Sequence, residues 1–269
     1  MVAPLLLAEL TWQEAAGLLG QRPVGLLPVG AIEAHGPHLP LDTDVRIAHA
    51  MALRAAALLE RDGLPVLVLP PIVYGVSFVG GCFPGTSPAD PDAFELYLRS
   101  VLLHLCEQGY RALGICNAHL EPAHVSAVRA AADAAQSATG VPIAVPDKRE
   151  QRWAVRLSEE FQRGARHAGS YETSLLLAIS PEAVHVAALE DLPPLWIDLP
   201  AQLRAGARTF AEAGSPLGYF GDPARASAEE GERLLAALAA MVREAVLEAL
   251  ASRGGVTPPA ERDPRGRPS

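Results

Sequence analysis

Short apolar runs that alternate with longer helical stretches constrain the fold of this chain more than any other feature. Each run has the length of one buried strand, and each intervening stretch carries apolar residues at helical spacing. The strand-like runs are Val24–Val29, Val66–Leu69, Ala112–Cys116 and Val141–Val145, and the helical stretches are Asp44–Glu60, a segment from Asp90 onward, Pro122–Ala138 and Ala226–Ser252. Strands joined through helices require crossover connections. The pattern therefore predicts an α/β fold with a mostly parallel sheet flanked by helices on both faces.

The C-terminal half sets the expected domain limits. The apolar run Val184–Ala188 predicts one additional strand. No linker interrupts residues 1–253, so we expect a single domain there. Residues 254–269 contain four prolines and no core-forming side chains, which predicts a disordered tail.

Composition excludes several classes of function. The chain has 22 Lys and Arg against 31 Asp and Glu, a net charge of −9, which disfavours nucleic acid as a partner. Its three cysteines share no CxxC spacing, so we expect a reducing, cytoplasmic location without disulfides. No stretch approaches the roughly 20 apolar residues of a membrane span. The N-terminus lacks the basic start of a signal peptide.

Acidic residues and histidines gather directly after two of the predicted strands. Ligands of parallel sheets bind beyond the carboxyl ends of the strands, where these side chains would meet. The first strand is followed by Glu33, His35 and Asp44, and the third by His119 and Glu121. Five such ligands suit two adjacent divalent ions, and mixed nitrogen and oxygen donors favour zinc, manganese or iron. The alternative is structural, with the aspartate capping a helix and the histidines buried and hydrogen-bonded.

Two further segments carry chemistry of lower specificity. His167 and Glu172 lie in the segment RHAGSYETS, where a histidine of near-neutral pKa serves as a general acid or base or has a structural role. Ser77 lies in a glycine-rich segment that lacks the nucleotide-binding motifs. Arg163 and Arg166 suggest an anionic group on the substrate, although exposed helix arginines are common.

The chain resembles the creatininase (creatinine amidohydrolase) family in four ordered motifs. They are LPVGAIEAHGPHLPLDTD, YGVS followed by FPGT, NAHLE, and HAGSYETS, which together span about residues 24–180. The resemblance implies an α/β sandwich on a mainly parallel sheet that often assembles as a homohexamer. It also implies a pair of divalent ions, zinc or manganese, that hydrolyse amide-like bonds of small molecules.

The same resemblance assigns roles to individual residues. Glu33 and His119 would bind one ion, His35 and Glu121 the other, and Asp44 would bridge them. The remaining roles are substrate contact for Ser77, proton transfer for His167, and orientation of His167 or of a ligand for Glu172.

The substrate pocket departs from the creatininase pattern while the metal ligands are retained. Leu120 stands where creatininase has a tyrosine, and the tryptophan that precedes the proton-handling histidine has no counterpart within Phe161–Arg166. Trp153 lies further upstream. We therefore expect a metal-dependent amidohydrolase that cleaves a C–N amide or cyclic-amide bond other than a peptide bond.

Other functions remain open at this point. Within the same family, the substrate is alternatively a formamide-type intermediate, a peptide or the cyclic ketone of a polyol. A different class is a non-catalytic protein that uses the metal site for assembly. A nicotinamide-dependent oxidoreductase is disfavoured because the glycine fingerprint is missing.

Overall fold

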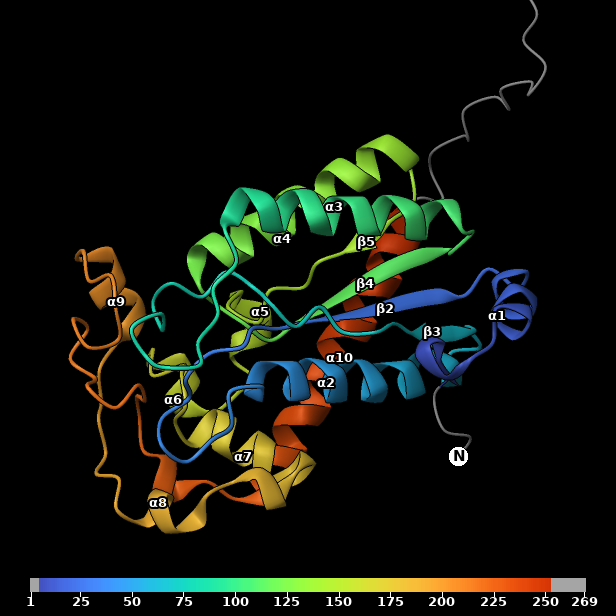
Figure 1. Cartoon of the computed structure of the whole chain (residues 1–269). Coiled ribbons are helices and arrows are strands. Elements are labelled where there is room, and N and C mark those ends of the chain that lie inside the picture. The colour runs from blue at the N-terminus through green and yellow to red at the C-terminus, as the bar shows by residue number, and fades with distance from the viewer. Residues whose placement is uncertain (1–4, 253–269) are drawn as a thin grey trace, which may run out of the picture.

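The computed structural model describes residues 5–252 and contains one parallel five-stranded sheet in the order β1-β3-β2-β4-β5 (Figure 1). The four predicted runs all form strands, although the fourth forms only a short edge strand. The strands are β1 (Leu5–Leu6), β2 (Val24–Val29), β3 (Val66–Val68), β4 (Ala112–Asn117) and β5 (Ile143–Ala144). The predicted fold class is confirmed. The predicted tail at 254–269 lies outside the described residues.

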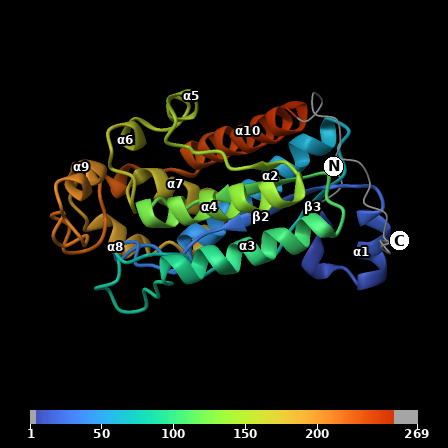
Figure 2. The same cartoon turned by 90° about the horizontal axis from the view of Figure 1, so that it is seen from above.

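Long helices cover both faces of the sheet (Figures 1 and 2). One face is covered by α2 (Thr43–Arg61), α7 (Ser170–Ile179) and α10 (Ala228–Ser252), and the other by α3 (Pro91–Glu107) and α4 (Pro122–Thr139). Side chains of β2 alternate between the two faces, with Leu26 packing toward α2 and Leu27 toward α3. Both are almost fully buried, which explains why the strand reads as a continuous apolar run.

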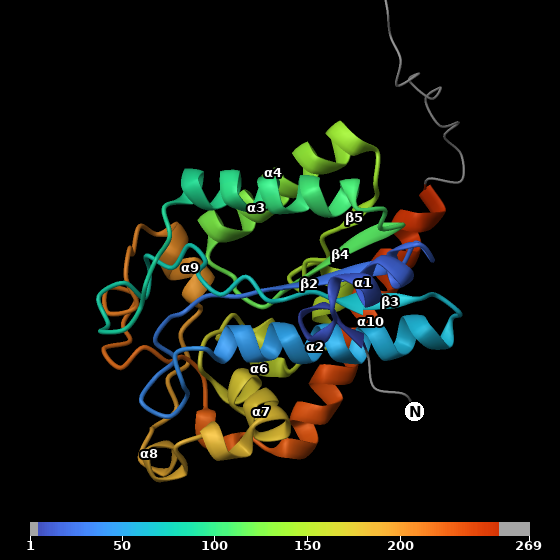
Figure 3. The ribbon, with the colours of Figure 1, turned by 45° about the vertical axis from the view of Figure 1, so that its right-hand side comes forward.

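Smaller elements surround this sandwich at both ends. They are η1 (Leu7–Glu9), α1 (Trp12–Leu19), α5 (Gln151–Ala154), α6 (Glu159–Gln162), η2 (Pro181–Ala183), α8 (Val186–Glu190), α9 (Leu199–Arg204) and η3 (Pro223–Arg225). Helix α1 lies at the end of the sheet where β2 begins, and α9 lies at the opposite end (Figure 3). None of the described helices is long and apolar enough to cross a membrane.

The predicted strand Val184–Ala188 is wrong. A turn of 3-10 helix ends at Ala183, and α8 begins two residues after Val184. The His185 carbonyl accepts the N–H of Leu189, a helical hydrogen bond, and Val186 is half-exposed at 51%. A five-residue apolar run does not distinguish a buried strand from a short surface helix, and here the preceding Pro181 starts helical turns.

The order of the strands places a topological switch at the centre of the sheet. After β2 the chain passes to β3 on one side and then crosses to β4 on the other side. Beyond their carboxyl ends, the loops that follow β2 and β4 diverge over opposite faces, which opens a crevice. Val29 at the end of β2 pairs with Asn117 at the end of β4. The two segments of acidic residues and histidines that follow these strands therefore start side by side.

Candidate metal centre

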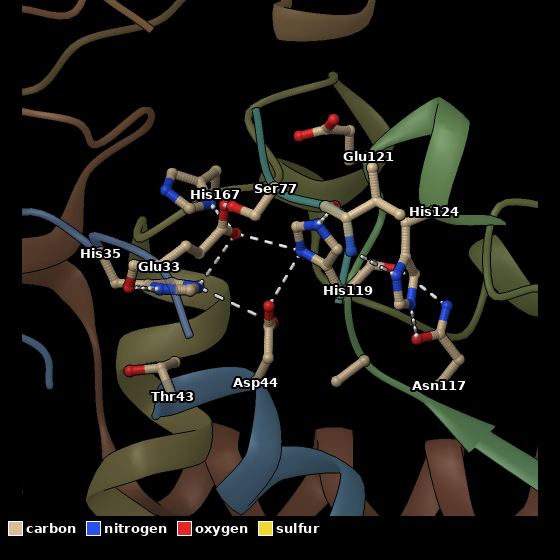
Figure 4. A network of polar contacts seen from close by, with 12 residues as sticks. Glu33, His35, Thr43, Asp44, Ser77, Asn117, His119, Glu121, His124 and His167 are labelled. Carbon is tan, nitrogen blue, oxygen red and sulfur yellow. Dashed lines mark hydrogen bonds and ion pairs between the residues drawn. The ribbon is translucent and has the colours of Figure 1, made fainter. Parts of the chain in front are cut away.

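Asp44 is held beside the end of β2 by a close backbone approach. A Cβ at Gly30 would lie 2.8 Å from the Val45 amide nitrogen, so only glycine allows the first turn of α2 to sit this close to the strand. Asp42 occupies the N-cap position without a capping side-chain hydrogen bond and instead pairs with Arg46 at 2.8 Å. The buried Asp44 carboxylate points toward the cluster formed after the two strands (Figure 4).

The side chains from the two strand ends converge on Asp44. His119 Nδ1 lies 2.9 Å from Asp44 Oδ2 and 3.1 Å from Glu33 Oε1. His35 Nε2 lies 3.7 Å from Asp44 Oδ1 and 3.5 Å from Glu172 Oε2. Figure 4 shows Glu33, His35, Asp44 and His119 pointing toward one another. The structure thus brings together four of the five predicted metal ligands, and Glu172 joins them.

Backbone carbonyls orient three histidine rings in the same manner. His35 Nδ1, His119 Nε2 and His167 Nε2 lie 3.1, 2.8 and 2.9 Å from the carbonyl oxygens of Glu33, Val76 and Ala34. A carbonyl only accepts, so each of these ring nitrogens donates and carries the proton. The opposite nitrogen of each neutral ring is then free to bind a cation, the arrangement typical of metal-ligating histidines.

Three overlapping groups of ligand atoms fit a cation. Each consists of three residues whose ligand atoms lie within 4.8 Å of one another: Glu33–Asp44–His119, His35–Asp44–Glu172 and Glu33–His35–His167. Asp44 is shared by two groups that also contain different histidines. The buried His35 Nε2 has no hydrogen-bond partner, and its separations from the surrounding carboxylates exceed hydrogen-bond length. These buried donors therefore fit divalent ions that take N and O ligands.

Imidazoles and carboxylates compensate one another in this buried site. Burial lowers the pKa of His35, but the carboxylates of Asp44, Glu172 and Glu33 outweigh it and raise the pKa to about 10. Burial raises the pKa of Glu33, but the imidazoles of His119, His167 and His35 bring it down to about 2. Burial raises the pKa of Glu172 to about 7, against the opposing effect of His35. Without metal, protons on the histidines thus neutralise the buried carboxylates, and bound cations would neutralise the same charge.

The glycine-rich loop after β3 supports both clusters. The Ser77 hydroxyl donates to Glu33 Oε2 at 2.5 Å, and Ser77 is fully buried. The Glu121 carboxylate accepts the N–H groups of Phe78 and Val79 at 3.1 and 3.0 Å. In Figure 4 this carboxylate points away from the four converging side chains. The predicted ligand Glu121 is thus outside the three groups found among residues 5–252.

His167 is placed by an unusual backbone conformation and by stacking. The next residue, Ala168, has a φ of 50°, the left-handed region, and its N–H donates to Glu172 Oε2 at 2.7 Å. The His167 ring stacks on Phe210 at a centroid distance of 4.2 Å and lies 4.4 Å from the His35 ring. Burial, reinforced by the charge of His35, lowers the pKa of His167 to about 4.

A cavity of about 400 Å³ opens onto these groups. Leu120, Glu121 and His167 line it, whereas Ser77, also expected to contact substrate, does not. Trp153 is buried in the core beneath α10 and lies outside the lining. The aromatic side chain in the wall is Phe210, which the sequence analysis missed because no motif or periodicity marks its segment.

Two other buried polar residues support the site, and neither was predicted from the sequence to do so. His124 Nδ1 accepts the Val76 N–H at 3.2 Å, and its Nε2 donates to Asn117 Oδ1 at 3.1 Å. Lys148 is almost fully buried and donates to the Ala118 carbonyl at 2.7 Å. His124 lies three residues after the motif NAHLE, so its position was a usable signal, but no pattern marks Lys148.

Comparisons with known proteins agree with this geometry. The family model Creatininase (creatinine amidohydrolase) matches residues 8–246. The mycofactocin precursor peptide peptidase of Mycolicibacterium smegmatis is 37% identical over 80% of this chain and 80% of its own. The creatinine amidohydrolase of Pseudomonas putida is 29% identical over 72% of this chain and 79% of its own. A solved structure named "Creatininase Mn" superposes with a TM-score of 0.71 at 27% identity, covering 91% of this chain and 98% of that one.

The family match spans most of the described sheet and includes both strand ends that carry the cluster. The predicted resemblance is therefore confirmed, and with it the predicted enzyme class. This chain is a member of the creatininase family of metal-dependent amidohydrolases.

Proposed function

We propose that this enzyme hydrolyses an amide bond in a short peptide or peptide-like molecule, with two divalent ions per subunit. The observation that carries the proposal is the set of three carbonyl-anchored histidines, whose free nitrogens face shared carboxylates at a cavity. The choice of a peptide is supported by relatives: the named peptidase is 37% identical and the named creatinine amidohydrolase 29%. This shifts the preference away from the non-peptide bond expected from the sequence.

Residues of the loop after β2, of α2, of the loop after β4 and of α7 would hold the ions. Glu33, Asp44 and His119 form one position, and His35, Asp44 and Glu172 form the other, with Asp44 shared. Glu172 takes the place proposed for Glu121 from the sequence, because both Glu121 oxygens accept backbone N–H groups. Bound divalent ions supply Lewis-acid polarisation of a carbonyl and lower the pKa of water.

His167 has the properties of a proton carrier. Its lowered pKa leaves the ring neutral near pH 7, and the bond from Nε2 to the Ala34 carbonyl leaves Nδ1 able to accept a proton. Nδ1 lies 3.6 Å from Glu33 Oε1, inside the cluster. Once protonated, the ring can donate to the amide nitrogen, which is too basic to leave as an anion. Glu121, whose pKa is raised by burial, is a second acidic group on the cavity wall.

The shape of the cavity supports a substrate larger than one small ring. Its volume of about 400 Å³ falls within the range that accommodates drug-sized ligands, roughly 300–1,000 Å³. Leu120 provides an aliphatic wall without a hydroxyl, and Phe210 provides the aromatic surface beside His167. These walls suit the backbone and side chains of a peptide.

The metal identity, assembly and location are also proposals. Mixed imidazole and carboxylate donors favour zinc or manganese, with iron as a further option. We propose a homohexamer, as the family resemblance implies. Three free cysteines, two of them buried, support a reducing cytoplasm.

The test compares two substrates on protein loaded with zinc or manganese. The mycofactocin precursor peptide is assayed for cleavage by mass spectrometry, and creatinine is assayed for creatine. We expect peptide cleavage that a chelator abolishes and that added metal restores. Creatine formation without peptide cleavage would refute the peptide assignment. The absence of both activities in fully loaded protein would refute cleavage of this peptide and of creatinine alike.

A further inference from the structure

The lining of the cavity contains three arginines as well as the metal cluster. Arg149, Arg166 and Arg204 lie on its wall, although the chain as a whole carries a net charge of −9. They come from three separate segments: the loop after β5, the stretch before α7, and the last residue of α9. Positive charge gathered from distant parts of an acidic chain calls for a physical reason, since like charges repel one another.

Two of these guanidinium groups, those of Arg166 and Arg204, form no ion pair within 4.0 Å among residues 5–252. Arg166 donates from Nε to the Phe161 carbonyl at 2.9 Å, and its guanidinium lies 4.8 Å from the Phe161 ring centroid. These contacts hold the side chain without neutralising it. Arg204 is exposed at the end of α9 and forms no ion pair within the described part of the chain.

The nearby carboxylates are already occupied. Asp147 accepts from Arg149 at 2.7 Å and from Arg129 at 2.9 Å, so that acid is shared by two cations. Asp198 Oδ1 accepts the Ala201 N–H at 3.0 Å as the cap of α9. Burial and the charge of Arg149 lower the pKa of Arg166; the charges of Asp198 and Asp147 oppose this lowering only in part, and Arg204 adds a smaller contribution to it. This wall therefore has a surplus of positive charge and unused N–H donors.

We propose that Arg166 and Arg204 form a subsite for a carboxylate group of the substrate, at a distance from the bond that the metal centre cleaves. The inference rests on the proposed function and adds the chemical class of the substrate: an amide that also carries a carboxylate. Guanidinium groups match the planar carboxylate through paired N–H donors. Leu120, Leu199 and Leu203 line the same cavity and provide apolar surface for the intervening part of the molecule.

A neighbouring arginine provides the matched control. Arg163 lies three residues before Arg166 but is outside the cavity lining, where it pairs with Glu159 at 3.4 Å and stacks on Trp196. Of the two sequence-predicted arginines, only Arg166 therefore lies in the cavity. Replacing Arg163 removes the same charge from the protein without touching the subsite.

The experiment measures binding by calorimetry to the metal-loaded protein. The probes are the peptide N-acetyl-Gly-Gly-Ala as the free acid, its C-terminal amide, and the amide with glutamate as the third residue. We expect a carboxylate-bearing probe to bind at least about tenfold more tightly than the neutral amide, as charge-assisted hydrogen bonds imply. Arg166→Gln and Arg204→Gln should each reduce this preference, and Arg163→Gln should retain it. The free acid and the glutamate peptide distinguish a terminal carboxylate from a side-chain carboxylate.

Three results would overturn the subsite. They are equal binding of acid and amide, binding of no probe, and a preference that survives both arginine substitutions, since the carboxylate would then be held by the metals. Arg204→Gln keeps the test valid if Arg166→Gln misfolds, because Arg204 is exposed. Binding is scored independently of cleavage, so failure of the proposed hydrolysis and failure of the subsite give different results.

Discussion

The Ser77 hydroxyl donates a hydrogen bond of 2.5 Å to Glu33 Oε2, so that only Oε1 of that carboxylate faces His119. Ser77 thereby fixes the orientation of a proposed metal ligand from a loop that follows a different strand. The sequence pointed to substrate contact for this serine. Its complete burial and its absence from the cavity lining instead favour a role in orienting Glu33, the proposed metal ligand.

Ser77→Ala is therefore expected to weaken metal binding by about 10- to 100-fold, the typical cost of losing a hydrogen bond to a metal ligand. The KM for substrate at saturating metal should change little. Metal affinity is measured by competition with a chromogenic chelator. Ser87→Ala is the control, since Ser87 lies in the same loop and bonds only the Gly85 carbonyl at 3.5 Å. Unchanged metal affinity with a raised KM would restore the substrate-contact role.

Asp44→Asn should remove most bound metal from both positions, because Asp44 belongs to both proposed ligand sets. The amide keeps the size of the side chain but loses the charge that two cations share. Metal content per subunit is measured by mass spectrometry after gel filtration. Asp42→Asn is the matched control at the same end of α2, where Asp42 pairs with Arg46. Full occupancy in Asp44→Asn would rule out Asp44 as the shared ligand.

His167→Gln should lower kcat by about 10²- to 10⁴-fold, the usual contribution of a general acid or base, while metal content stays unchanged. Glutamine keeps a donor for the Ala34 carbonyl but has no nitrogen that takes up a proton near neutral pH. His185→Gln, on the exposed start of α8, serves as the control. Loss of metal from His167→Gln would instead support the third group, in which His167 is a ligand with Glu33 and His35.

Metal-free protein should lose stability as the pH rises from neutral to 10. The pKa of His35 is raised from 6.5 to about 10, so its stabilising charge is complete below pH 6.5 and is lost as the pH rises through 10. The pKa of Glu172 is raised from 4.5 to about 7, so the loss of stability caused by its ionisation falls between those pH values and is largely complete at neutral pH. Metal-loaded protein has already released these protons and should change much less. Urea unfolding of both forms at neutral pH and at pH 10 measures this, and parallel losses would contradict it.

The sequence predicted those parts of the site that depend on strand ends. Glu33, His35 and His119 follow buried apolar runs, and parallel strands necessarily bring their carboxyl ends to one edge. That β2 and β4 are direct neighbours was not predictable, because the chain visits β3 between them. The assignment of the predicted strand at 184–188 failed for a related reason: a short apolar run does not reveal its surroundings.

The direction in which side chains point was the other property that could not be predicted from the sequence. The sequence assigned Glu121 as a metal ligand and Glu172 to the orientation of His167 or of a ligand. In the structure, the Ala168 N–H, at a residue of left-handed φ, holds the Glu172 carboxylate near His35, and the N–H groups of residues 78 and 79 hold the Glu121 carboxylate at the loop. Neither feature has a signature in the sequence. Phe210 was missed because its segment has no regular periodicity, and only tertiary packing brings it onto His167.

The proposed metal ligands all precede residue 173, whereas Leu199, Leu203, Arg204 and Phe210 come from one later stretch. That stretch adds no strand to the sheet and has an apolar cluster of its own, formed with Ala165 and Phe220. One part of the cavity wall is therefore supplied by a stretch that holds none of the proposed metal ligands, while Leu120 and Arg166 supply wall from the part of the chain that does. Transplanting residues 199–210 from one family member into another should therefore alter substrate preference while the metal content stays unchanged.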